Sequence, residues 1–104
     1  HMDKDKKILL WLIAGSRGGI NRALILKYIV SSPSNANRIS IATGIEYKTV
    51  QHHLSILEKN GLLSSIGDKY GKTYFASELL DKNLEAFNEI CKDMGLDNND
   101  FKDK

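Results

Sequence analysis

The spacing of apolar positions changes near residue 62, and this change separates predicted helices from predicted strands. Before residue 62, apolar residues recur at intervals of three and four, which is typical of helices packed on a core. The pattern predicts four helices: one capped by Asp3 or Asp5 and ended by Gly15, one from about Ile20 to Val30, one capped by Asn35 or Asn37 and ended by Gly44, and one from about 46 to 60.

These helices differ in how much of their surface is apolar. The first is apolar on all sides from Ile8 to Ile13, so we expect it to be buried on more than one face. The third turns Ile39 and Ala42 inward and is followed by a buried Ile45. The second and fourth each have one buried stripe, formed by Ile20, Leu24, Ile25, Tyr28 and Ile29 and by Val50, Leu54 and Leu57, respectively.

After residue 62 the pattern predicts a β-hairpin and one more helix. Residues 62–66 have the pattern of a short strand, and residues 72–76 are rich in β-branched and aromatic residues. The two segments flank a turn at 67–71. A continuous helix is expected from Ser77 to Gly95. Its apolar residues follow a heptad spacing, which is typical of a helix-packing seam, at Leu80, Leu84, Phe87, Cys91 and Met94.

The order of the elements predicts the fold class. A short helix, a glycine turn, a longer helix and a two-stranded ribbon form a winged helix-turn-helix. We therefore expect a mainly α fold with a small β-hairpin (α+β) and extra N- and C-terminal helices. Residues 1–2 read as a cloning remnant, residues 3–95 as a single domain and residues 96–104 as a flexible polar tail.

Specific motifs strengthen this interpretation. The stretch IATGIEYKTVQHHLSILEKNGLL resembles the core of ArsR-like winged helix-turn-helix transcriptional regulators, and the wing residues 70–74 fit the same pattern. The matching core positions are Ile39, Gly44, Ile45, Thr49, Val50, His53, Leu54, Leu57, Gly61 and Leu62. Residues 15–22 (GSRGGINR) together with 47–54 (YKTVQHHL) resemble an archaeal branch of that superfamily. The resemblance covers about residues 14–76 and implies a DNA-binding regulator.

One face of the fourth helix is expected to read DNA bases. It lies opposite the apolar stripe, contains no acidic residue, and consists of Tyr47, Lys48, Gln51, His52 and Ser55. Glutamine suits adenine and lysine suits guanine in the major groove. Thr49, near the helix start, is expected to bond a phosphate. Glu46 is interpreted as a capping or dipole-stabilising residue, because a carboxylate next to DNA is repelled by phosphates.

Further basic and aromatic residues complete the predicted DNA surface. Lys69, Tyr70 and Lys72 in the hairpin are expected on the DNA backbone or minor groove, with a plain solvated hairpin tip as the alternative. Arg17 and Arg22 are interpreted either as phosphate clamps or as structural partners of acidic residues, and Arg38 is also counted as a DNA contact. His53 is expected at the core margin as a structural, hydrogen-bonded residue, and His52 is expected to be exposed.

The terminal helices are expected to form a homodimer interface, as the resemblance implies. Two-fold symmetry suits paired DNA half-sites. The predicted interface residues are Trp11, Leu12, Leu80, Leu84, Phe87, Cys91 and Met94. The alternative is that both helices pack only on their own domain.

Composition limits the remaining possibilities. A net charge of +2 is uninformative, but residues 17–72 contain eight basic and three acidic residues, whereas residues 78–104 contain four basic and eight acidic ones. A single cysteine, Cys91, excludes an intramolecular disulfide and fits a reducing cytoplasm. No apolar run reaches the length of a membrane span. No nucleophile–base pair, carboxylate pair or metal cluster has a usable spacing, so we expect no enzyme, metal, cofactor or small-molecule ligand.

The prediction is therefore a sequence-specific regulator that binds double-stranded DNA, with the helix of residues 46–60 in the major groove and the wing of residues 67–72 on the backbone or minor groove. The alternative is a winged helix that binds a protein or an RNA. Structured RNA is the weaker version, because the A-form major groove is too narrow for a helix.

Overall fold

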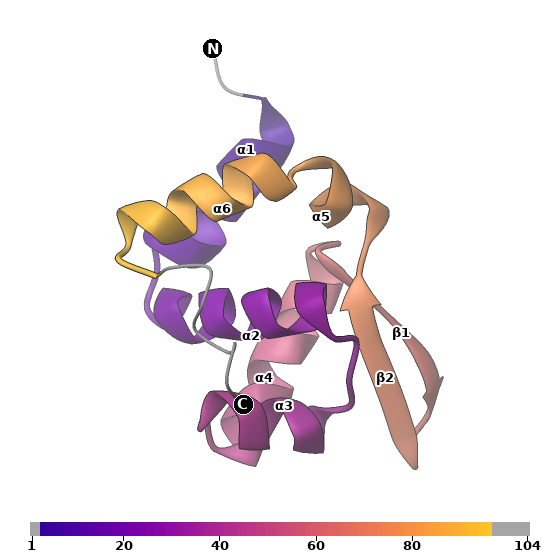
Figure 1. Ribbon diagram of the computed structural model, residues 1–104. Helices are drawn as coiled ribbons and strands as arrows, with labels where there is room; N and C mark the ends of the chain where they lie inside the picture. The colour runs from indigo at the N-terminus through magenta and orange to yellow at the C-terminus, as the bar shows by residue number, and fades with distance from the viewer. Residues whose placement is uncertain (1–2, 97–104) are drawn as a thin grey trace.

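The computed structural model describes residues 3–96 and has the predicted winged-helix architecture (Figure 1). The elements in chain order are α1 (Lys4–Leu9), the π-helical turn η1 (Leu10–Ala14), α2 (Gly19–Ser31), α3 (Ala36–Thr43), α4 (Tyr47–Lys59), β1 (Leu63–Asp68), β2 (Gly71–Ala76), α5 (Glu78–Lys82) and α6 (Leu84–Asp93). The fold class is confirmed as mainly helical with a β-hairpin wing.

The central helix α2 lies between two groups of elements. Figure 1 shows α1, η1 and α6 on one side of α2 and α3 with α4 on the other, while the hairpin stands at the end of this arrangement. The core is continuous through all of them, since Leu12 of η1, Ile25 of α2, Leu54 of α4 and Phe87 of α6 belong to one buried cluster.

Helix capping resolves two choices that the sequence left open. Asp3, not Asp5, caps α1, because its carboxylate accepts a hydrogen bond from the Lys6 amide at 2.9 Å. Asn35, not Asn37, caps α3 by accepting from the Arg38 amide at 2.8 Å. Such caps satisfy amides that have no partner within the helix. Gly44 ends α3 with a φ of 74°, the left-handed conformation that glycine adopts most easily.

The first helix differs from its prediction in two ways. It widens after Leu9 into the π-turn η1, in which the Gly15 amide donates to the Leu10 carbonyl at 2.9 Å. It is also not buried all round, because Trp11 is 61% exposed while Leu12 and Ile13 lie in the core. The stripe expected on α2 needs a similar correction, since Ile20 is 57% exposed at the helix start.

The hairpin is longer and its turn tighter than expected. β1 and β2 pair antiparallel in register from Leu63 opposite Ala76 to Asp68 opposite Gly71, which leaves only two residues in the turn. Ser34 forms an isolated bridge to Tyr74, with backbone N–H···O distances of 3.1 and 2.9 Å. This bridge fixes the wing to the segment that precedes α3.

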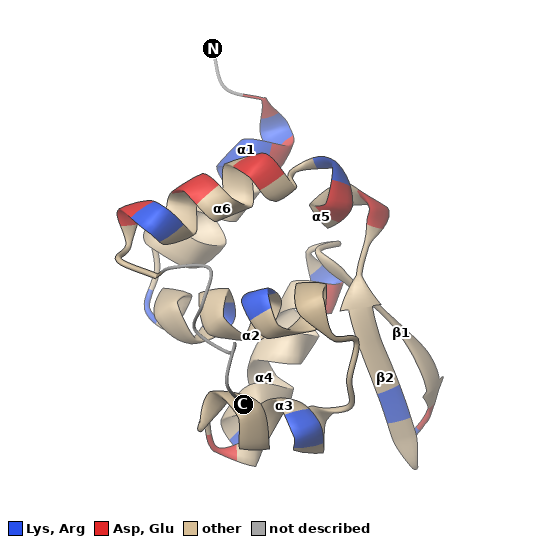
Figure 2. Cartoon of the chain, in the orientation of Figure 1, with Lys and Arg blue, Asp and Glu red and all other residues tan. Residues whose placement is uncertain are grey.

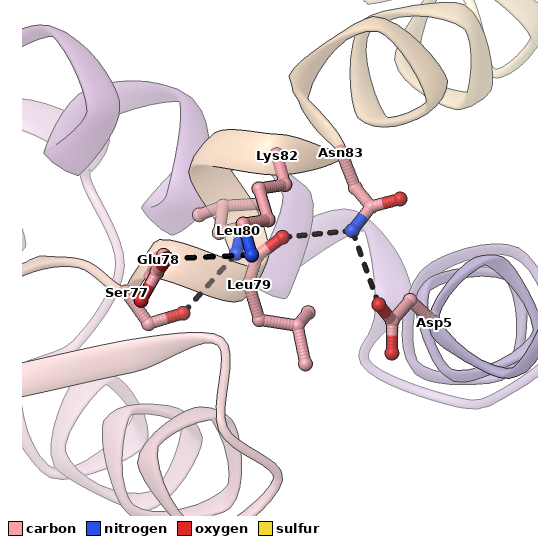
Figure 3. Close-up of polar contacts among 7 residues, drawn as sticks. All are labelled: Asp5, Ser77, Glu78, Leu79, Leu80, Lys82 and Asn83. Atoms are coloured by element: carbon pink, nitrogen blue, oxygen red, sulfur yellow. Dashed lines mark hydrogen bonds and ion pairs between the residues drawn. The ribbon is translucent and has the colours of Figure 1, made fainter.

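The last predicted helix is interrupted at Asn83, which separates α5 from α6. Figure 3 shows the Asn83 side-chain amide between the Leu79 carbonyl, 2.8 Å away, and the Asp5 carboxylate, 3.5 Å away. The same view shows Ser77 capping α5 through the Leu80 amide and an exposed Lys82–Glu78 ion pair at 3.3 Å. The polar side chain of Asn83 competes with the helix for backbone partners and turns the chain there.

The domain boundary shifts by one residue. Leu96 packs on the core and its amide donates to the Cys91 carbonyl at 2.9 Å, so this residue is not part of a flexible tail. Residues 1–2 and 97–104, predicted as a remnant and a tail, lie outside the described residues. Between residues 3 and 96, no helix is both long enough and apolar enough to cross a bilayer.

Candidate nucleic-acid interface

The polar face of α4 is open to solvent, as the sequence predicted. Tyr47, Lys48, Gln51, His52 and Ser55 are all exposed, and none of them is covered by another part of the described chain. The opposite face is fully buried through Val50, Leu54 and Leu57. The helix is therefore fixed by its apolar side, while its polar side is free to contact another molecule.

A groove joins this helix to the wing. It has a volume of about 470 Å³ and is lined by Tyr47 and Gln51 of α4 and by Lys69, Tyr70 and Lys72 of the wing. These five residues, which the sequence predicted as base contacts or as backbone contacts, therefore line the same groove. The groove also contains Asp68 and Gly71 of the predicted wing, and four residues that the sequence analysis did not place at the site, namely Asn35, Ala36, Asn37 and Tyr74.

The missed residues enter the groove through tertiary contacts. The Ser34–Tyr74 bridge brings the start of α3 next to β2, and no local sequence signal indicates that pairing. Burial, Glu58 and Tyr47 together raise the pKa of the Tyr74 hydroxyl, so Tyr74 stays neutral and can donate a hydrogen bond. Asn35 is already engaged as the cap of α3.

At the start of α4, two side chains pair with each other. The Thr49 hydroxyl donates to the Glu46 carboxylate at 3.3 Å, while Glu46 makes no side-chain capping bond to the helix. The capping role considered for Glu46 is therefore wrong, although its position at the positive helix end is favourable. The Thr49 hydroxyl can accept a second hydrogen bond, so its predicted phosphate contact stays a prediction.

The wing tip presents a cation over an aromatic ring. Tyr70 is 86% exposed, and the Lys69 ammonium lies 5.2 Å from the centre of its ring. The Tyr70 amide donates to the Asp68 carboxylate at 2.9 Å, which fixes the two-residue turn. A glycine is required at Gly67, because its φ is 122° and an added Cβ would lie 2.1 Å from the Gly71 carbonyl oxygen.

The three arginines have different environments. Arg17, in the loop before α2, and Arg38, on α3, are exposed and stay candidates for phosphate contacts. Arg22 is only 5% exposed and donates to the carbonyl oxygens of Leu12 and Arg17, to the Ser16 hydroxyl and to the His53 ring. The phosphate-clamp reading of Arg22 is wrong, and its structural partners are neutral groups rather than acidic residues.

The adjacent histidines separate as expected. His52 is exposed, whereas His53 is 6% exposed and its Nδ1 lies 3.2 Å from the Arg22 guanidinium. Burial lowers the pKa of the His53 imidazole, and the charges of Arg22 and His52 lower this pKa further. The structural role predicted for His53 is confirmed.

The predicted dimer residues also separate into two groups. Leu12, Leu80, Phe87 and Cys91 are at most 1% exposed within a single chain, so they cannot form an intermolecular surface. Their inclusion was wrong because the heptad seam of the last helix packs on its own domain. Trp11 is exposed, and Leu84 and Met94 are partly buried at the surface.

Charge is unevenly distributed over the elements. Figure 2 shows acidic residues concentrated on α5 and α6 and basic residues on α2, α3 and β2, with further basic residues on α1, α5 and α6. Residues 3–96 contain no group of three or more histidine, cysteine or acidic side chains placed to hold a metal ion. Among the residues that line the groove between α4 and the wing, Lys69 and Lys72 are basic and Asp68 is acidic.

Comparisons with known proteins agree with this geometry. Residues 21–65 match the sequence model of the family described as bacterial regulatory protein, arsR family. No curated protein matches the chain. The matched segment runs from α2 into β1 and contains the complete helix-turn-helix.

Several solved structures have a similar fold. A predicted DNA-binding transcriptional regulator from E. coli is 24% identical with a TM-score of 0.58, over 86% of this chain and 88% of that one. HlyU from Vibrio cholerae N16961 is 16% identical with a TM-score of 0.61, over 88% and 96%. Streptococcus pneumoniae FabT, solved in complex with DNA, is 18% identical with a TM-score of 0.61, over 86% and 66%.

The fold and the matched helix-turn-helix show what the chain is similar to. Its fold is the winged-helix fold of these solved regulators, and the family match covers 45 of its 104 residues. The similarity to the arsR family covers the helix-turn-helix, within residues 21–65.

Proposed function

We propose that the protein is a homodimeric, sequence-specific regulator that places α4 in the DNA major groove and the wing on the backbone or minor groove. The observation that supports this docking is the single groove lined by Tyr47, Gln51, Lys69, Tyr70 and Lys72. An α-helix fits the width of the major groove, and donors and acceptors along α4 suit base edges. We place its action in the cytoplasm and retain the archaeal branch as its proposed origin.

In this arrangement the residues have distinct tasks. Lys48, Gln51, His52 and Ser55 project from the exposed face of α4 and contact base edges. Lys69 and Lys72 of the wing contact phosphates or the minor groove, as do Arg17 and Arg38 from their exposed positions. Thr49 bonds a phosphate near the helix start, where the helix dipole also favours an anion.

Binding of fragments from the native genome tests the proposal. We expect selected fragments to share a sequence, and the affinity to fall steeply between low and physiological salt because phosphate contacts release counterions. Lys48→Ala should relax base choice at a cost of about 1–3 kcal/mol, whereas Lys69→Ala should weaken all sequences alike. Absence of binding at low salt would rule out DNA as the partner. Salt-independent capture of a protein would support the alternative winged-helix interaction module.

The homodimer is proposed to form through the terminal elements. Trp11 is 61% exposed, and a groove of about 460 Å³ between α1 and α6 contains the basic side chains Lys6 and Lys82 beside acidic Glu85, Glu89 and Asp93. The groove also contains apolar Leu10 and Ile90, and this mixture of opposite charges and apolar side chains suits an isologous contact. A second copy can thus bury an apolar side chain that one chain leaves in water.

Sedimentation of substituted proteins tests the dimer. Trp11→Glu should yield a folded monomer, because the side chain is exposed in one chain and a charge opposes burial at an interface. Phe87→Ala is the contrasting change, expected to lower the unfolding free energy by about 3–5 kcal/mol as a core cavity. A wild-type chain that sediments as a monomer at all concentrations would exclude this dimer.

A further inference from the structure

The buried Arg22 side chain connects three parts of the molecule. Its Nε donates to the Leu12 carbonyl in η1 at 2.7 Å, and one terminal nitrogen, Nη2, donates both to the Ser16 hydroxyl and to the Arg17 carbonyl, the latter at 3.0 Å, in the loop before α2. The remaining terminal nitrogen lies 3.2 Å from Nδ1 of His53 on α4. One guanidinium therefore links the N-terminal segment, the loop and the candidate recognition helix.

The glycine loop is shaped to this contact. A Cβ added to Gly18 would lie 2.8 Å from Cε1 of His53 and 3.2 Å from the Arg22 guanidinium. A Cβ added to Gly19 would lie 1.7 Å from the Ile13 carbonyl oxygen. The two motifs of residues 15–22 and 47–54 thus meet at the Arg22–His53 contact, and the glycines permit their close approach.

The contact requires neutral His53. A guanidinium is a donor only, so Nδ1 must be the acceptor and the ring proton must lie on Nε2. Protonation would place an N–H group and a positive charge against the buried Arg22. The charged or titratable groups acting on His53 are Arg22 from α2 and His52 from its own helix. No carboxylate among residues 3–96 lies within ion-pair distance of Arg22 to offset that repulsion.

We propose that Arg22 and His53 form a proton-sensitive joint that positions α4, so that protonation of His53 weakens DNA binding. The proposal rests on the proposed DNA-binding function. In the free protein, a protonated His53 can move away from Arg22 as α4 shifts on the core. DNA requires α4 in its original position, so binding must expel that proton or hold two repelling cations together. Arg22 and His53 are positioning residues, because neither lies on the exposed reading face.

The pH dependence of DNA affinity in matched variants tests the joint. His53→Asn can keep an acceptor near the Nδ1 position but cannot be protonated. Fluorescence anisotropy with a selected genomic fragment should be compared between about pH 7.5 and 5.5, which spans the ordinary histidine range. The Kd of the wild type should rise about three- to tenfold more than the Kd of His53→Asn, since a one-unit difference in pKa corresponds to tenfold. His52 is present in both proteins, so the comparison isolates the substitution at residue 53.

Two controls separate the possible failures. Asn88→Ala, an exposed change on α6, should keep the wild-type pH dependence, and circular dichroism should show every variant folded at both pH values. If the DNA affinities of wild type and His53→Asn depend on pH in the same way, the proposed joint is rejected. If no DNA binds at any pH, the proposed function fails, and nuclear magnetic resonance then tests the joint alone. We expect the resonance spectra to show His53 as the neutral Nε2–H tautomer, and its protonation to shift the signals of Leu12 and Arg17. If the Leu12 and Arg17 signals do not shift when His53 is protonated, the proposed joint is rejected.

Discussion

Gln51 and Tyr47 pair with each other on the exposed face of α4, where the Gln51 amide donates to the Tyr47 hydroxyl over 3.2 Å. The two residues are one helical turn apart, which places their side chains on the same surface. The hydroxyl restrains the glutamine amide before any partner binds. A restrained side chain loses less conformational entropy on binding, so this pair favours a defined base preference.

Removing the Tyr47 hydroxyl should therefore reduce the discrimination between DNA sequences more than it reduces the affinity for the selected sequence. Tyr47→Phe keeps the aromatic ring but frees the Gln51 amide, and we expect a smaller ratio between Kd values for mutated and selected sequences. Gln51→Ala should remove the preference at one base position, at a cost of about 1–3 kcal/mol. Competition binding with single-base variants of the selected site measures both effects. A Tyr47→Phe protein with unchanged discrimination would show that the pair has no reading role.

Glycine substitutions in the wing should have opposite outcomes at two neighbouring positions. Gly67→Ala places a methyl group 2.1 Å from the Gly71 carbonyl oxygen at a φ of 122°, so the hairpin must distort. Gly71→Ala adds a methyl group with no neighbour within 4 Å, which makes it a matched control. We expect Gly67→Ala to lower both thermal stability and DNA affinity, and Gly71→Ala to leave thermal stability unchanged. Thermal denaturation and anisotropy measure the two quantities, and equal behaviour of the variants would contradict the hairpin geometry.

Protein stability should fall as the solution becomes acidic, for a reason that is independent of DNA. Folding lowers the pKa of His53 below its ordinary value through burial and the charges of Arg22 and His52. Between the folded and unfolded pKa values the unfolded chain binds more protons, so acid favours unfolding there. The stabilisation is present above the unfolded pKa of about 6.5 and is lost as pH falls through the folded pKa. Urea denaturation at several pH values should show a smaller decline for His53→Asn than for wild type.

The sequence predicted the helix-turn-helix and wing because their signals are local. The Asn35 cap, the Gly44 turn and the spacing of Val50, Leu54 and Leu57 each indicate structure within a few residues. The exposed face of α4 follows directly from that spacing. These features come from backbone hydrogen bonding and helical period, which a short stretch of sequence contains.

Tertiary contacts account for the features that the sequence did not predict. The break at Asn83 depends partly on Asp5, which lies 78 positions earlier, and the burial of Arg22 depends on a π-turn and on His53. The heptad seam of the last helix indicates burial but does not distinguish the same chain from a second copy. For that reason Phe87 was predicted at a dimer interface and lies in the core instead.

The contact between Asn83 and Asp5 predicts that the stability of the domain depends on the charge at residue 83. Asn83→Asp keeps the size of the side chain but places a second carboxylate close to Asp5, where the amide nitrogen now lies 3.5 Å away. The substitution also removes the donor to the Leu79 carbonyl. We expect a lower unfolding free energy near neutral pH, by about 1–3 kcal/mol, because a hydrogen bond is lost and like charges repel. The loss of stability should shrink when salt is added or when acid neutralises a carboxylate.

Asn83→Ala separates the two causes, since it removes the hydrogen bonds without adding charge and should show little salt dependence. Lys82→Ala is the surface control, because its ion pair with Glu78 is exposed and such pairs contribute little. If Asn83→Asp and Asn83→Ala lose the same stability at every salt concentration, Asp5 does not contact this turn in solution.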